Sequence, residues 1–187
     1  MSTKFDITGI VADHFGTLVD YSTGDRNYMD LCIQFLLPAI IVLLYWHFAP
    51  SLCNGVGQSI DQAVIAAFSI FTALLFNLQV MMMGLLSSSN NSVELPQSGS
   101  GTEPNLENQA LASRKIKGKR DFITEIFYNI SYAILVAITL VGVSIVIIFF
   151  DLSSFFLLKF VEVYLVSHFL LVGLMVLKRT HSLFTHF

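Results

Sequence analysis

The sequence predicts an all-α integral membrane protein whose four transmembrane helices form two hairpins after a short N-terminal amphipathic helix. Hydrophobic residues make up 55% of the 187 residues and charged residues only 12%, and the mean hydropathy is +0.71. Four apolar segments are each long enough to cross about 30 Å of hydrocarbon at about 1.5 Å per residue. Basic residues are concentrated between the second and third segments and after the fourth, and this distribution predicts the orientation of the chain in the membrane.

Residues 1–30 are predicted to be a cytosolic segment that contains the amphipathic helix, from about Thr3 to Asp20. Its apolar residues recur at three- and four-residue spacing, at Ile7, Ile10, Val11, Phe15, Leu18 and Val19. A lipid-binding interfacial helix normally carries Lys or Arg on its polar face, whereas this one carries only Lys4 against three Asp residues. We therefore expect the helix to pack against the chain's own cytosolic helix ends rather than to lie on the membrane.

Residues 31–86 are predicted to form the first hairpin, with spans over about 31–49 and 63–86. Pro38 lies inside the first span and frees a backbone carbonyl, which Gln34, one turn earlier, or a neighbouring helix can help to satisfy. The connection between the two spans contains no Lys or Arg, which is typical of a short non-cytoplasmic loop.

Residues 87–120 are predicted to be a flexible, basic, cytosolic linker between the hairpins. The linker is rich in Ser, Asn, Gly and Pro, and such a segment cannot bury enough apolar surface to offset the entropy lost on ordering. Half of the ten Lys and Arg residues of the chain lie at its C-terminal end. They form a basic cluster that sets the topology: Arg114, Lys115, Lys117, Lys119 and Arg120.

Residues 121–177 are predicted to form the second hairpin, and residues 178–187 a cytosolic tail. A helix over 121–150 is longer than the thickness of the hydrocarbon core by about half. Its first turns should therefore lie outside the bilayer. Those turns carry a polar stripe that is a candidate for docking a cytosolic partner: Glu125, Tyr128, Asn129 and Tyr132.

The Lys and Arg residues are distributed unequally between the two sides of the predicted membrane. Two precede the first span, five lie in the linker and two follow the last span, while the far-side loops have none. The tenth, Lys159, lies inside the fourth span. The positive-inside rule therefore predicts that both termini and the linker are cytoplasmic.

Inserting an ionisable side chain into a membrane costs about 2.5 to 3.5 kcal/mol near the centre of a helix on insertion scales. Each such residue therefore requires a structural or functional explanation. The fourth span carries Lys159, Glu162 and His168. Lys159 and Glu162 are three residues apart and can form an ion pair, within one chain or between copies. His168 can either hydrogen-bond to Tyr164 as a packing residue or act as a titratable step in an ion or proton path.

The second span carries a stripe that is a candidate for helix association. Ala66 and Ala73 lie on it together with Asn77. Small residues permit close approach of helices, and a buried Asn can donate and accept hydrogen bonds across the contact. We expect a homo-oligomer, with Asn77 as a fourth intramembrane polar candidate.

The known catalytic and metal-binding motifs that we sought are absent from the sequence, so we expect neither an enzyme nor a bound cofactor or metal. Cys32 and Cys53 have no metal-ligand spacing and are interpreted as packing residues. The net charge of −3 argues against direct binding of nucleic acid.

Three segments resemble those of small four-helix bacterial membrane proteins that accompany antiphage defence genes, the group that includes the membrane subunit of the Kiwa system. The segments are residues 74–78, 128–132 and 174–179. The resemblance implies a homo-oligomer in the bacterial inner membrane that detects phage-induced membrane disturbance and works through a cytosolic, DNA-binding partner.

Two functions remain as hypotheses. The leading one is a non-enzymatic inner-membrane sensor or scaffold of an antiphage defence system, which signals to or recruits the cytosolic partner. It places nearly all contact surface of the chain in the cytosol, because the far-side loops are short. The alternative is a small oligomeric ion channel or pore-forming effector, lined by the polar residues of the fourth span.

Overall fold

A computed structural model describes residues 7–18, 28–52, 57–91, 106–150 and 156–186. These residues form five helices and no strand. The helices are α1 (Ile7–Gly16), α2 (Tyr28–Leu52), α3 (Gly57–Asn91), α4 (Leu106–Phe149) and α5 (Phe156–His186). The fold class is therefore all-α, as the sequence predicts.

Helices α2 to α5 are each long and apolar enough to cross a membrane. The qualifying segments are Leu31–Phe48, Asp61–Ser88, Lys117–Phe149 and Leu157–Ser182. Each overlaps one of the spans that the sequence predicts, which confirms four candidate spans and indicates a multi-pass membrane protein.

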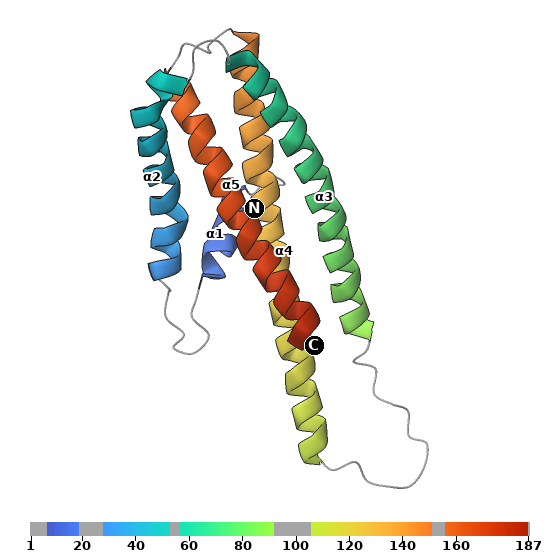
Figure 1. The fold of residues 1–187 in the computed structure, drawn as a ribbon. Helices are drawn as coiled ribbons and strands as arrows, with labels where there is room; N and C mark the ends of the chain where they lie inside the picture. Colours follow the sequence, from blue (N-terminus) through green and yellow to red (C-terminus); the bar gives the residue numbers. More distant parts are fainter. Residues whose placement is uncertain (1–6, 19–27, 53–56, 92–105, 151–155, 187) are drawn as a thin grey trace.

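The four long helices lie side by side in the order α2, α5, α4, α3 (Figure 1). Helix α4 packs against α3 and α5, and α5 packs also against α2. The second predicted hairpin is thus a packed pair, whereas α2 and α3 lie at opposite edges of the row (Figure 1). The helices of the first predicted hairpin are therefore not a packed pair. They instead bind the two sides of the α4–α5 pair.

The apolar core lies mainly on one stripe of α4. Buried side chains recur along that helix at spacings of three, four and seven residues: Ile123, Ile126, Ile130, Ala133, Ala137, Leu140 and Ile147. Helix α3 contributes Phe68 and Met82 to this core, and α5 contributes Phe169, Val172 and Val176. By contrast, α2 exposes large apolar side chains on most of its surface, which is typical of a helix surrounded by lipid.

Several predicted boundaries differ from the structure, and three of them extend a helix into the predicted linker or tail. Helix α3 continues to Asn91, α4 begins at Leu106 instead of residue 121, and α5 continues to His186 through the predicted tail. Residues 106–120 of the predicted linker are helical because Ala, Leu, Glu, Gln, Lys and Arg, which predominate there, all favour helix. Residues 92–105 lie outside the described residues.

The basic cluster lies on the first turns of α4, which extend beyond the ends of the other helices (Figure 1). Four of its side chains, those of Arg114, Lys117, Lys119 and Arg120, are exposed, and the side chain of Lys115 lies outside the described residues. The cluster is therefore held on a rigid element, and not on a flexible linker as expected.

Helix α1 lies between α2 and the α4–α5 pair and contacts α4 (Figure 1). It packs against the chain's own helices, as expected, but its partners Asn129 and Gln34 lie inside candidate spans and not at cytosolic helix ends. Helix α1 is shorter than predicted, since it covers Ile7–Gly16, and residues 1–6 and 19–27 lie outside the described residues.

Candidate functional site

Two groups of hydrogen-bonded polar side chains lie inside the packed helices, and we treat them together as the candidate site. The first, which we call the histidine network, joins α1 to α2, α4 and α5. Six side chains form it: His14, Thr17, Gln34, Asn129, Tyr132 and His168.

His14 is the centre of the histidine network and is fully buried, with 0% of its surface exposed. Its Nδ1 lies 2.7 Å from Asn129 Oδ1, and its second ring nitrogen, Nε2, lies 2.9 Å from Gln34 Nε2. An amide oxygen only accepts and an amide nitrogen only donates, so these partners assign the proton of a neutral ring to Nδ1. The ring also stacks on Tyr132 with centroids 3.9 Å apart and planes 7° apart.

Thr17 fastens the end of α1 to two neighbouring helices. Its hydroxyl lies 2.9 Å from Asn129 Oδ1 and 2.8 Å from the backbone oxygen of His14. The guanidinium of Arg179 on α5 donates to the backbone oxygen of Thr17 at 2.9 Å and pairs with Glu125 at 3.5 Å. The C-terminal end of α1 is thus bound to both α4 and α5.

His168 satisfies the backbone carbonyl that Pro38 leaves without a helical partner. A proline removes the N–H that would bind the carbonyl four residues earlier, which here belongs to Gln34. His168 Nδ1 lies 3.2 Å from this oxygen, and its Nε2 lies 2.8 Å from the hydroxyl of Tyr132. Nδ1–H therefore donates to the Gln34 carbonyl, and Nε2 accepts from Tyr132. The sequence predicted a neighbouring helix as one source of this satisfaction, and the structure confirms it.

The environment of His14 keeps its ring uncharged. The pKa of His14 is lowered from 6.5 to about 4, chiefly by burial, and the neighbouring His168 and Arg179 act in the same direction. The hydrogen bonds to Asn129 and Gln34 act in the opposite direction. At neutral pH the hydrogen bonds of His14 to the long helices are therefore neutral, whereas the bond from Arg179 to the Thr17 backbone is charged.

The second group, which we call the lysine network, joins α3, α4 and α5. Its members are Asp61, Ser144, Lys159 and Glu162. The ammonium of Lys159 pairs with Asp61 and, at 3.1 Å, with Glu162. Glu162 also accepts a hydrogen bond of 2.8 Å from the Ser144 hydroxyl. The predicted pair of Lys159 and Glu162 thus forms within one chain.

The lysine network is buried and has a formal charge of −1, from two carboxylates and one ammonium group. Asp61 and Glu162 are 1% and 3% exposed. Asp61 Oδ2 is buried and has no hydrogen-bond partner among the described residues. Removing the ammonium would leave two buried carboxylates without a countercharge, so Lys159 holds the three helices together electrostatically.

An apolar layer separates the two networks. Tyr132 and Ser144 are twelve residues apart on α4, or about 18 Å along the helix axis. Between them, the side of α4 that faces its neighbours buries Ala133, Val136, Ala137 and Leu140, and Phe169 of α5 packs in the same cluster. Within the described residues, the two networks are therefore separate polar sites.

Searches of family models, curated proteins and solved structures find no match for this chain. Its function must therefore be inferred from the arrangement of its own residues. Among the described residues, no group of three or more His, Cys, Asp or Glu side chains is placed to hold a metal ion.

The stripe predicted to dock a partner lies largely inside the chain. Asn129 and Tyr132 are buried in the histidine network, and Glu125 pairs with Arg179. Tyr128 is half-buried. The expectation of an open docking surface was wrong because α1 and α5 cover this side of α4.

The stripe predicted for helix association faces away from the other helices. Ala66, Ala73 and Asn77 are exposed, while α3 packs on α4 through other residues, including Phe68 and Met82. Within one chain the stripe therefore mediates no helix packing, and its role between copies stays a prediction.

The sequence reasoning missed four members of the site, His14, Thr17, Asp61 and Ser144, and two of them, His14 and Asp61, had a signal. His14 lies four residues after Ile10 and three after Val11, so it sits within the apolar stripe of its helix. Asp61 was assigned to a loop, although it begins an apolar span at the same membrane side as Lys159. A polar residue inside an apolar helix stripe, and opposite charges at the same depth in the membrane, are the sequence patterns that indicate such site residues.

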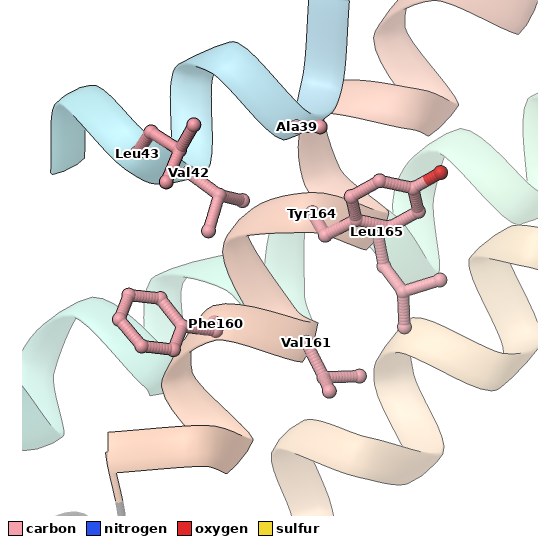
Figure 2. A pocket seen from close by; sticks show the side chains of 7 residues that line it. All are labelled: Ala39, Val42, Leu43, Phe160, Val161, Tyr164 and Leu165. Atoms are coloured by element: carbon pink, nitrogen blue, oxygen red, sulfur yellow. The ribbon is translucent and has the colours of Figure 1, made fainter. Parts of the chain in front are cut away.

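A shallow apolar groove runs between α2 and α5 beside the histidine network. Its volume is about 440 Å³, and Figure 2 shows its lining residues: Ala39, Val42, Leu43, Phe160, Val161, Tyr164 and Leu165. Tyr164 also stacks on His168, with planes 7° apart, in place of the hydrogen bond that the sequence suggested. The groove lies within two candidate spans, where lipid chains are the natural neighbours.

Proposed function

We propose that this chain is a non-enzymatic sensor in a cell membrane, and that docking and release of α1 carries the signal. The observation that supports the proposal is the buried position of His14, which is held by Asn129 of α4 and Gln34 of α2. Neutral hydrogen bonds of His14, together with one bond from Arg179 to the Thr17 backbone, therefore hold α1 against the spans.

Helix α1 has the properties of a releasable element. It has ten residues, and a helix of this length is marginal in water unless other parts of the chain support it. A hydrogen bond between neutral groups contributes a net of only about 0.5 to 1.5 kcal/mol. The cost of undocking α1 is thus modest compared with the cost of separating the long helices, whose contacts are mainly apolar.

The histidine network also couples α1 to the spacing of the membrane spans. His14 requires Gln34 and Asn129 at hydrogen-bond distance on two different spans, and His168 ties the Gln34 carbonyl to a third. A disturbance that changes the separation of α2, α4 and α5 would break these short contacts before it disrupts the apolar core. We therefore favour a membrane disturbance as the signal.

The cellular setting is proposed from charge and from the resemblance to antiphage-defence membrane proteins. From the charge bias we propose that both termini and the start of α4 face the cytoplasm, and from the resemblance that the membrane is a bacterial inner membrane. The exposed basic residues Arg114, Lys117, Lys119 and Arg120 then form the surface that meets a cytosolic, DNA-binding partner. Ala66, Ala73 and Asn77 on α3 form the proposed contact between copies in a homo-oligomer.

The test is co-purification of the full chain, in mild detergent, with the protein encoded beside it in the genome. Thr17→Val removes the hydroxyl that binds Asn129 and keeps the shape of the side chain. We expect it to release α1, to raise hydrogen exchange over residues 7–18, and to change the amount of bound partner severalfold.

The matched control is Thr139→Val, because the Thr139 hydroxyl is exposed and bonds only within its own helix, to the backbone of Leu135. This variant should behave like the wild-type chain. If the wild-type chain does not retain the protein encoded beside it, signalling from this chain to that partner is contradicted. Equal partner binding by the two variants, with α1 released only in Thr17→Val, would contradict the role of α1.

The lysine network favours a second candidate function, an oligomeric ion channel or pore-forming effector. Buried Asp61 and Glu162 and half-buried Lys159 inside candidate spans are unusual unless they serve transport or assembly. Liposome flux that Glu162→Gln abolishes, with assembly intact, would support this function. Absence of flux, or flux that is unchanged in the variant, would exclude it.

A further inference from the structure

A second groove lies where the end of α1 approaches α2 and α5. Its volume is about 370 Å³. The lining residues are Leu18, Ile33, Gln34, Leu171, Leu174, Met175, Lys178 and Arg179. Unlike the groove between the middles of α2 and α5, this one combines an apolar wall with two basic side chains.

The two kinds of side chain are separated along α5. Leu171, Leu174 and Met175 lie deeper in the span, and Lys178 and Arg179 follow one turn later, close to its end at Ser182. An apolar wall that ends in basic side chains at the membrane surface matches a phospholipid, whose acyl chain lies in the hydrocarbon and whose phosphate lies at the interface.

The charge of the groove favours an anionic ligand. Arg179 is engaged with Glu125 and with the backbone of Thr17, so that ion pair is close to neutral. Lys178 is exposed and adds a positive charge beside it. A zwitterionic lipid would bring a positively charged ammonium group to the same place, where this charge is unfavourable.

We propose that this groove binds one anionic phospholipid, such as phosphatidylglycerol. The phosphate contacts Lys178 and the edge of Arg179, and an acyl chain lies along Ile33, Leu174 and Met175. A free phosphate ion would use only the basic end and would leave the apolar wall unused. The apolar wall therefore favours a lipid over a soluble anion.

This lipid site does not depend on the proposed sensor function, because it rests on the shape and charge of the groove alone. It does lie beside the histidine network, since Gln34 belongs to both. Lipid binding without any effect on a partner would leave the site valid and count against the sensor.

The test is native mass spectrometry of the full chain, released from detergent with an equal mixture of palmitoyl-oleoyl phosphatidylglycerol and phosphatidylcholine. We expect the wild-type chain to retain the anionic lipid preferentially. Lys178→Gln should lower that preference about fivefold, because one interfacial basic residue contributes about 1 kcal/mol. Lys119→Gln is the matched control, since it removes an exposed positive charge from α4, which contributes no lining residue to the groove, and it should leave the preference within about twofold of wild type.

A second pair of variants tests the apolar wall. Leu174→Trp places a bulky ring on the groove, whereas Leu177→Trp places it on a neighbouring exposed position that does not line the groove. Both leucines are more than half exposed, at 61% and 66%, so the fold should tolerate either change. Only Leu174→Trp should reduce retention of phosphatidylglycerol severalfold.

Three results would overturn the proposal. One is equal retention of the two lipids by the wild-type chain, and another is an equal loss of preference in Lys178→Gln and Lys119→Gln. The third is displacement of the lipid by millimolar inorganic phosphate or glycerol phosphate, which would identify a site for a soluble anion. Retention that depends on Lys178 and Leu174 and resists these anions would support the lipid site.

Discussion

At the scale of single residues, two buried histidines hold the helices together in different ways. His168 supplies the donor for the Gln34 carbonyl that Pro38 leaves unpaired, and this contact is a structural requirement of a proline inside a span. His14 instead holds a separate helix against the spans through Asn129 and Gln34. Protonation of His14 would replace an acceptor nitrogen by a donor that faces the Gln34 amide nitrogen.

The pKa of His14 predicts that acid weakens the folded state. The pKa falls from 6.5 in the unfolded chain to about 4 in the folded chain, so between these values only the unfolded chain binds the proton. The contribution of neutral His14 to the free energy of unfolding is therefore fully present above about pH 6.5. The free energy of unfolding decreases by about 3 kcal/mol as the pH falls to about 4. This decrease is measured by unfolding the full chain in mixed micelles at pH values between 6.5 and 4 and following the unfolding by circular dichroism.

The comparison that isolates His14 is His14→Gln, which keeps a polar side chain and removes the titrating ring. The groups that face His14 are Asn129 and Tyr132 of α4, Gln34 of α2, and His168 and Arg179 of α5, and all remain in the variant. The variant should lose most of the pH dependence between 6.5 and 4. An identical pH dependence in both chains would show that other groups cause it.

At the scale of the helices, the lysine network acts as a joint between three elements. Asp61 begins the span of α3, Lys159 and Glu162 lie on α5, and Ser144 lies on α4. Lys159 contributes the positive charge that makes burial of the two carboxylates tolerable.

Replacing Lys159 with Met should be strongly destabilising, because it leaves Asp61 and Glu162 buried without a countercharge. Loss of one partner from a buried ion pair typically costs about 3 to 5 kcal/mol. The triple variant Asp61→Asn, Lys159→Met and Glu162→Gln removes all three charges and should recover most of that loss. Thermal unfolding of the three chains in the same detergent makes the comparison.

The lysine-network prediction fails if the triple variant is no more stable than Lys159→Met. In that case the network would stabilise the chain through its shape and hydrogen bonds and not through charge balance. Ser144→Ala serves as a milder comparison, since it removes one hydrogen bond to Glu162 and should cost about 1 kcal/mol.

The sequence predicts those parts of this structure that depend on local patterns. Length and hydropathy locate the four spans, the three-residue spacing predicts the pair of Lys159 and Glu162, and proline chemistry predicts an unpaired carbonyl near Gln34. The partners Asp61 and His14 depend on which helices are neighbours and at what depth. That information arises from packing between distant segments, so local periodicity does not contain it.

At the scale of the whole molecule, the row of helices places different surfaces at its centre and edges. The α4–α5 pair at the centre has the larger buried fraction, and α2 and α3 at the edges expose most of their apolar side chains. Such exposure would be unfavourable in water, whereas in a bilayer it needs no compensation. The row is therefore an arrangement that suits a lipid environment.

A cysteine-accessibility experiment on this row tests membrane insertion and orientation together. Single cysteines replace Arg114, Phe149 and Leu74 in a chain that carries Cys32→Ser and Cys53→Ser. All three positions are exposed on the chain, and Arg114 and Phe149 lie toward opposite ends of α4. Leu74 lies at the middle of the span Asp61–Ser88.

The positive-inside rule predicts that a membrane-impermeant maleimide labels the Phe149 position in intact spheroplasts and the Arg114 position in inverted vesicles. The Leu74 position should resist the reagent in both preparations, because hydrocarbon surrounds it, and should react after solubilisation with denaturant. The reverse labelling of the two ends of α4 would contradict the proposed orientation. The Leu74 position is exposed on the chain, so it is protected from the reagent only if lipid or a second copy covers it. Labelling of this position in intact membranes would therefore contradict insertion.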